Sequence, residues 1–105
     1  MVIIETSVFT RRLLELLNDE AYRKLQTALV NRPDAGLLIV GSGGLRKLRW
    51  ALQGRGKRGG VRVIYYWAVA RQQLLMLLIY PKNERDDLTP EQLKVLRKIV
   101  EEKYP

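Results

Sequence analysis

Cysteine and histidine are both absent from this chain of 105 residues. Without cysteine there are no disulfides, thiol nucleophiles or zinc ribbons, and without histidine there is neither imidazole acid–base chemistry nor the commonest metal ligand. No apolar run approaches the roughly 20 residues that cross a bilayer, and the N-terminus lacks the layout of a signal peptide. We therefore expect a cytoplasmic protein without membrane contact, in which any catalysis runs without thiol or imidazole groups.

Acidic residues are missing from nearly half of the sequence. Lys and Arg number 19 and Asp and Glu 11, which gives a net charge of +8, yet segments 1–34 and 84–105 are almost neutral. Between residues 35 and 83 there is no carboxylate, but there are nine cations: Arg46, Lys47, Arg49, Arg55, Lys57, Arg58, Arg62, Arg71 and Lys82. This segregation favours a positive surface that faces a polyanion, with a basic face kept for solubility as the alternative.

The length, with 47% hydrophobic and 29% charged residues, is typical of one globular domain over residues 1–105. Hydrophobic periodicity predicts a strand at residues 2–5 and then two helices that form a hairpin. Ser7 is expected to cap the first helix, and Asn18 and Asp19 start the second, which Pro33 ends. The expected apolar stripe of the first helix is Val8, Leu13, Leu14 and Leu17.

From residue 45 onward, the sequence pattern predicts strands at residues 45–50, 61–67 and 74–80. Residues 53–60 contain four glycines and three cations and indicate a mobile hairpin loop. Thr89, Pro90 and Gln92 are typical of a helix start, and Leu93, Leu96, Ile99 and Val100 would be the buried stripe of that helix. Because the last three strands follow one another through hairpins, we expect an α+β fold with a mainly antiparallel sheet.

Several kinds of site are excluded by spacing. The glycines at residues 41–44 lack the Lys-Ser/Thr ending of a phosphate-binding loop, and Ser7 and Ser42 have no histidine partner. Glu84, Asp86 and Asp87 lie beside Lys82 and Arg85, so we interpret them as solvated carboxylates near a helix start rather than metal ligands. We expect neither a metal nor a cofactor.

The strand at residues 61–67 places an arginine beside aromatic side chains. Alternation puts Arg62, Ile64 and Tyr66 on one face and Val61, Val63, Tyr65 and Trp67 on the other. We expect Tyr65 and Trp67 in the core and a more open Tyr80, which would join Arg62, Lys82 and loop cations on one surface. Cations that hold a backbone and aromatic rings that stack bases together favour single-stranded nucleic acid.

Four runs resemble a known family: GGLRKLR at residues 43–49, GRGKRGG at 54–60, VRVIYY at 61–66 and IYPKNE at 79–84. They are similar to the HigB-like branch of the RelE/ParE toxin superfamily. The resemblance implies a small fold with two N-terminal helices and a C-terminal helix on a curved sheet. It also implies a toxin that cleaves mRNA in the ribosomal A site, and a HigA-like, DNA-binding antitoxin as its partner.

The resemblance also implies roles for individual residues. Arg62 would contact the scissile phosphate, and Lys47, Arg49 and Lys82 match cationic positions, with Lys57 or Arg58 as substitutes. Further RNA or ribosome contacts would come from Arg46, Arg55, Tyr66, Tyr80 and Asn83. The sequence departs from the family pattern at Asn83, where an arginine is expected, and at Thr89, where a catalytic tyrosine is expected; Tyr80 is a candidate replacement for that phenol.

A metal-independent mechanism is compatible with these residues. A lysine crowded by cations loses affinity for its proton, so Lys82 or Lys57 is the predicted base for the 2′-hydroxyl, while Arg62 and Arg49 stabilise the phosphorane. The products would be a 2′,3′-cyclic phosphate and a 5′-hydroxyl. Two other functions stay open at this point: a ParE-like gyrase inhibitor and a non-catalytic nucleic-acid-binding module.

Overall fold

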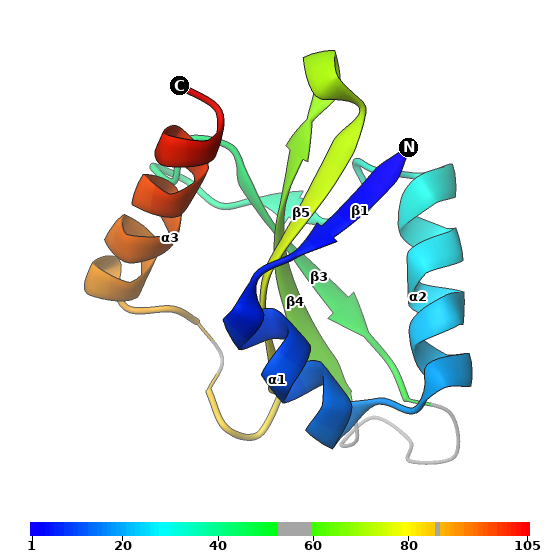
Figure 1. Cartoon of the computed structure of the whole chain (residues 1–105). Coiled ribbons are helices and arrows are strands. Elements are labelled where there is room, and N and C mark those ends of the chain that lie inside the picture. The colour runs from blue at the N-terminus through cyan, green and yellow to red at the C-terminus, as the bar shows by residue number, and fades with distance from the viewer. Residues whose placement is uncertain (53–59, 86) are drawn as a thin grey trace.

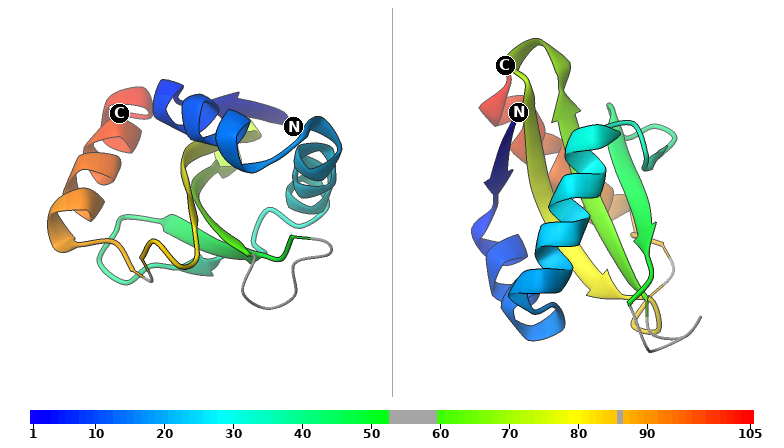
Figure 2. Two further views of the ribbon diagram at one scale, coloured as in Figure 1. Left: turned by 90° about the horizontal axis from the view of Figure 1, so that it is seen from below. Right: turned by 90° about the vertical axis from the view of Figure 1, so that its right-hand side faces the viewer.

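The computed structural model describes residues 1–52, 60–85 and 87–105, and in them a five-stranded sheet carries helices on both faces (Figures 1 and 2). The strands are β1 (Val2–Glu5), β2 (Leu37–Leu38), β3 (Leu45–Trp50), β4 (Val61–Ala68) and β5 (Gln73–Pro81). Their order is β1-β5-β4-β3-β2; β1 is parallel to β5, and the other pairs are antiparallel. The expected α+β fold is confirmed, and residues 53–59 of the expected loop at 53–60 lie outside the described part of the chain.

The first helix, α1 (Ser7–Leu16), starts one residue earlier than the sequence indicates. Thr6, not Ser7, is the N-cap, because its hydroxyl accepts a hydrogen bond from the Phe9 amide and donates one to the Leu77 carbonyl. That second bond ties the helix start to β5. Phe9 and Leu13 are consequently buried, and the predicted stripe is wrong at Val8 and Leu14, whose side chains are exposed.

The other two helices follow the sequence more closely. Asn18 caps α2 (Asp19–Asn31), and Thr89 and Gln92 form a reciprocal capping box at the start of α3 (Pro90–Lys103). In α3, Leu96 and Val100 are buried as expected, whereas Ile99 is exposed. Both views show α1 and α2 at a steep angle to each other, so the helical hairpin is open (Figures 1 and 2). None of the helices in the described ranges is long and apolar enough to span a membrane.

The sheet separates two hydrophobic cores. One lies under α1 and α2 and contains Val61, Val63 and Tyr65 of β4, and the other lies under α3 and contains Ile64. This alternation in β4 confirms the predicted faces. Tyr65 is fully buried; its hydroxyl donates to the Pro33 carbonyl at 2.6 Å and accepts from the Gly36 amide at 2.8 Å.

A β-bulge in β5 changes which residues share a face. The pairing with β4 passes from Ile64–Leu78 to Tyr65–Met76, so Leu77 is the extra residue. Leu74 and Met76 belong to the core under α1 and α2, and simple alternation would place Tyr80 there as well. Because the bulge shifts the parity, Tyr80 belongs to the core under α3 and pairs directly with Arg62.

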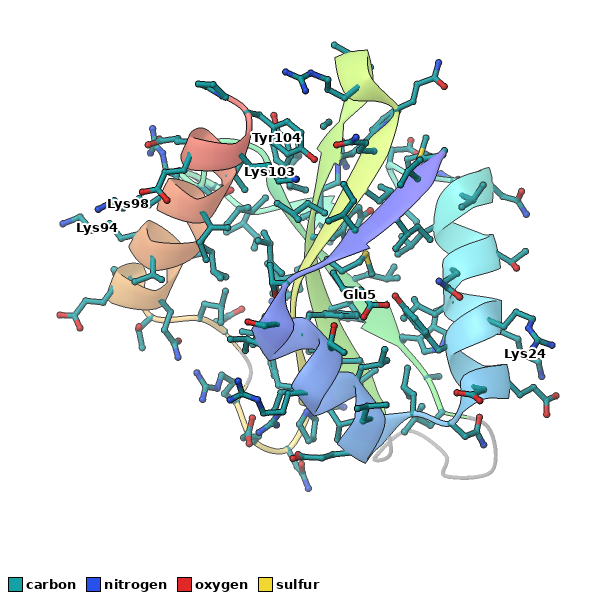
Figure 3. All side chains as sticks on the ribbon, viewed as in Figure 1. Glu5, Lys24, Lys94, Lys98, Lys103 and Tyr104 are labelled. Atoms are coloured by element: carbon teal, nitrogen blue, oxygen red, sulfur yellow. The ribbon has the colours of Figure 1, made fainter. Side chains whose placement is uncertain are left out.

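A partly buried network joins β1 to the first two helices. The two carboxylate oxygens of Glu5 accept hydrogen bonds from Thr10 at 2.6 Å and from the Tyr22 hydroxyl at 2.7 Å, and Glu5 lies between β1 and α2 in Figure 3. Burial, together with the Glu5 carboxylate, raises the pKa of Tyr22 well above its ordinary value of 10.0. The folded protein therefore holds this proton more tightly than the unfolded chain does.

This network predicts a loss of stability at alkaline pH. Above about pH 10 the unfolded chain releases the Tyr22 proton while the folded protein still keeps it, so unfolding is increasingly favoured as pH rises. Urea unfolding between about pH 9 and pH 11 should show the free energy of unfolding falling more steeply for the wild type than for Tyr22→Phe. Equal slopes for the two proteins would contradict this account.

Candidate nucleic-acid interface

Three cations gather on the face of the sheet that α3 covers. Lys47 pairs across the sheet with Ile64, and Arg49 pairs with Arg62, in the β3–β4 register. Ile64 belongs to the core under α3, so these paired positions and Arg62 share that face. We call Lys47, Arg49 and Arg62 the basic cluster. It combines two strands that the sequence separates by the glycine-rich segment.

Arg62 is the unusual member of the basic cluster because it is only 7% exposed. Within the part of the chain that the structure describes, its guanidinium group makes neither a hydrogen bond nor an ion pair. Withdrawing a cation from water without an anionic partner costs several kcal/mol. A guanidinium group is planar, carries five N–H donors and stays protonated in proteins, so a buried one is well suited to bind the oxygens of a phosphate.

Asp87 is the carboxylate beside the basic cluster. Its Oδ1 lies 2.5 Å from the Lys47 Nζ, although the Asp87 side chain is 79% exposed and that of Lys47 only 18%. The hydrogen bond and charge of Lys47, together with the charges of Arg49 and Arg62, hold the pKa of Asp87 below its ordinary value. The carboxylate therefore lies within the field of all three cations.

A groove of about 400 Å³ opens next to the basic cluster. Lys47, Arg49 and Asp87 provide its polar lining, and Leu37, Val40, Ile64, Leu88 and Leu93 are among the apolar residues. The groove runs from the edge strand β2 to the start of α3. Lys94 and Lys98 extend from the face of α3 directed away from the sheet (Figure 3), so these two cations do not add to the cluster.

The turn after β5 brings Lys82 and Asn83 close to Arg62. The Lys82 amide donates to the Gly60 carbonyl at 3.0 Å, which continues the β4–β5 ladder by one step beyond Pro81. Gly60 precedes Arg62 by two residues, about 7 Å along a strand. The exposed Lys82 and Asn83 therefore lie at the same end of the sheet as Arg62.

Two arginines fix this turn, and the sequence interpretation missed both. Arg12 of α1 donates from Nη2 to both carboxylate oxygens of Glu84, each at 3.1 Å. The guanidinium carbon of Arg85 lies 5.8 Å from the centre of the Tyr80 ring. The contact of Arg85 with Tyr80 had a signal in the sequence, since Arg85 is a cation that closely follows Lys82. Arg12, 72 positions away from Glu84, gave no such signal.

Two predicted contact residues, Tyr80 and Arg46, do not join the basic cluster. Tyr80 is paired with Arg62 but is only 1% exposed, so the prediction of an open Tyr80 is wrong. Arg46 points to the turn before β2, where its Nη1 donates to the carbonyls of Asp34 and Gly36 at 3.3 and 2.8 Å. The predicted contacts Arg55, Lys57 and Arg58 lie outside the described residues.

Tyr66 has a packing role at the other end of β4. Its ring lies 5.6 Å from that of Tyr104, between centroids, at an angle of 31°. On its other side, a Cβ at Gly44 would lie 3.0 Å from the Tyr66 ring, and Gly44 has a φ of +106°. The side chain is thus held between the C-terminus and the glycine loop. Four residues, about 13 Å along a strand, separate it from Arg62.

The described residues contain no group of three or more Asp, Glu, His or Cys side chains that could hold a metal ion. The groups that the structure brings together at the site are a buried arginine, an exposed lysine and the cations around them. These groups can bind a phosphodiester and stabilise negative charge that develops on it.

The comparisons with known proteins agree with the α+β fold and show the family of this chain. Residues 1–104 match the family described as "RelE toxin of RelE / RelB toxin-antitoxin system". The chain therefore belongs to the RelE toxin family. A solved structure of a double arginine-to-alanine mutant of the E. coli toxin RelE in the free state is similar in fold, with a TM-score of 0.59 and 12% sequence identity. That similarity covers 93% of this chain and 94% of the E. coli chain.

Proposed function

We propose that this toxin is a ribosome-dependent mRNA endoribonuclease of the HigB-like branch, acting in the ribosomal A site. The observation that carries the proposal is the buried Arg62, which forms no direct hydrogen bond or ion pair with the described residues and lies in a cluster of like charge. Because the Asp87 carboxylate is bonded to Lys47, a phosphodiester can supply the oxygens that the Arg62 guanidinium group binds. The family membership and the four residue runs quoted above support the same activity.

The proposed reaction is an attack of the ribose 2′-oxygen on the adjacent phosphorus. The 2′-oxygen loses its proton to a base and bonds to phosphorus, which closes the 2′,3′-cyclic phosphate. The bond from phosphorus to the 5′-oxygen breaks, and that oxygen takes a proton from water and leaves as a hydroxyl. Arg62 and Arg49 bind the phosphoryl oxygens and stabilise the charge that develops on them. We assign the base to Lys82, since its position next to the Arg62–Tyr80 pair brings an amine to the phosphate; Lys57 remains the alternative.

The ribosome supplies the orientation of the message, which compensates for catalytic residues that the toxin lacks. Asn83 and Thr89 stand where the family pattern has an arginine and a tyrosine, and Tyr80 is too buried to replace that tyrosine. A message held in the decoding centre is already oriented, and orientation alone contributes several kcal/mol to such a reaction.

Cleavage of translated and of naked mRNA by the purified protein tests this proposal. We expect breaks inside translated reading frames and little cleavage of the same message without ribosomes, as mapped by primer extension. Equal rates on both would contradict ribosome dependence. Tight RNA binding without any cleavage would instead indicate a binding module, and inhibition of gyrase supercoiling would indicate a ParE-like toxin.

A cognate antitoxin follows from membership of a toxin–antitoxin family, and we propose a HigA-like protein with a DNA-binding domain. The exposed side chains of Leu37, Leu38 and Val40 lie beside the basic cluster along the groove. A segment with both apolar and acidic residues complements this surface in shape and in charge.

A further inference from the structure

Asp87 introduces a negative charge into an otherwise positive surface. It is the acidic residue among the described residues that line the groove, and its carboxylate is bonded to Lys47. Exposed carboxylates ordinarily remain in water, since an exposed ion pair contributes at most about 1 kcal/mol. The Asp87 carboxylate is exposed to water and at the same time faces the cations that a phosphate would contact.

The geometry identifies which atoms compete. A carboxylate and a phosphate both present paired oxygens to an ammonium or guanidinium group. The Asp87 Oδ1 already accepts a hydrogen bond from the Lys47 Nζ, and the charges of Arg49 and Arg62 act on the same carboxylate. An RNA phosphate that binds Lys47 must therefore displace Asp87 or share the cation with it.

We propose that Asp87 is a specificity-determining residue that competes with RNA phosphate for the basic cluster and so weakens the binding of RNA that no ribosome holds in place. The inference rests on the proposed function, because it concerns the same surface. A message positioned by the ribosome is bound through other contacts as well, so Asp87 mainly weakens the binding of free RNA. The carboxylate acts as an internal counter-ion.

A catalytic use of Asp87 as the base is the main alternative. The structure argues against it in two ways: one of the two carboxylate oxygens already accepts a hydrogen bond from Lys47, and the cations around the carboxylate lower its proton affinity. A base for a 2′-hydroxyl works best with a pKa near the operating pH.

The test is the affinity for a fluorescent single-stranded RNA oligonucleotide, measured by anisotropy at several salt concentrations. Asp87→Asn removes the charge and keeps the shape. Glu101→Gln is the matched control, since it removes one carboxylate from an exposed ion pair with Arg97 on α3 and changes the net charge equally. We expect Asp87→Asn to bind about two- to fivefold more tightly than wild type. Its slope of log affinity against log salt should be steeper by about 0.7, as for one more phosphate contact.

Equal affinities and slopes for Asp87→Asn and Glu101→Gln would overturn the inference. So would a loss of cleavage in Asp87→Asn with unchanged RNA binding, which would make Asp87 the base. Binding to naked RNA is measured without any cleavage, so the two proposals fail separately. If the wild-type protein cleaves no translated message while Asp87→Asn still binds RNA more tightly, the nuclease proposal fails and the competition stands.

Discussion

Replacing Arg62 with alanine is expected to lower the rate of cleavage of translated mRNA by about 10²- to 10³-fold, the usual effect of removing one donor that stabilises transition-state charge. The fold should be retained. The side chain bonds to no other group among the described residues, so its removal leaves no described partner unsatisfied. Cleavage rates on a translated reporter message, with thermal unfolding as the check on folding, measure both effects.

Two further variants make the Arg62 result specific. Arg62→Lys keeps the charge but loses the planar pair of donors, so we expect most of the activity to be lost here too. Arg23→Ala removes an exposed arginine from α2, on the opposite face of the sheet, and should cleave at the wild-type rate. Near wild-type cleavage by Arg62→Ala would remove the central residue of the proposed mechanism.

Lys82→Arg is expected to be as inactive as Lys82→Ala, with both slowed by about 10²- to 10⁴-fold. Arginine keeps the positive charge at this exposed turn, but its guanidinium group does not deprotonate in proteins and cannot serve as a base. The measurement is single-turnover cleavage on programmed ribosomes at saturating toxin, so that weaker binding does not contribute to the observed rate.

Retention of activity in Lys82→Arg, with loss in Lys82→Ala, would show that Lys82 acts through its charge alone and would move the base to Lys57. Lys94→Arg provides the matched control, because the Lys94 side chain points away from the sheet (Figure 3). It should cleave like the wild type.

Local patterns predicted most of the fold. The apolar run at residues 61–67, the capping box at Thr89 and Gln92, and the breaks at Asn18 and Pro33 each specify an element through its own backbone chemistry. Errors arose where a distant segment decided the outcome. The Thr6 hydroxyl bonds to β5 and shifts the start of α1, which turns Phe9 inward and Val8 outward.

The candidate site was predictable in its charge and not in its geometry. Segregation of nine cations into residues 35–83 indicated a polyanion, and strand alternation placed Arg62 correctly. Whether Tyr80 would be open, and which carboxylate would approach the cations, depended on contacts between segments far apart in the chain.

The sequence by itself determined the order of the elements, the two-faced β4 and the positive charge of one surface, since each is a property of neighbouring residues. The tertiary structure alone decided that Tyr80 is buried in the core under α3, because the extra residue at Leu77 reverses the alternation of β5 and α3 covers the face that results. It also decided that Lys47 meets Asp87, 40 positions away. The alternation of side chains between the two faces of a sheet can be counted only along a strand without a bulge. The ion pair between Lys47 and Asp87 forms only when the fold brings these two residues together.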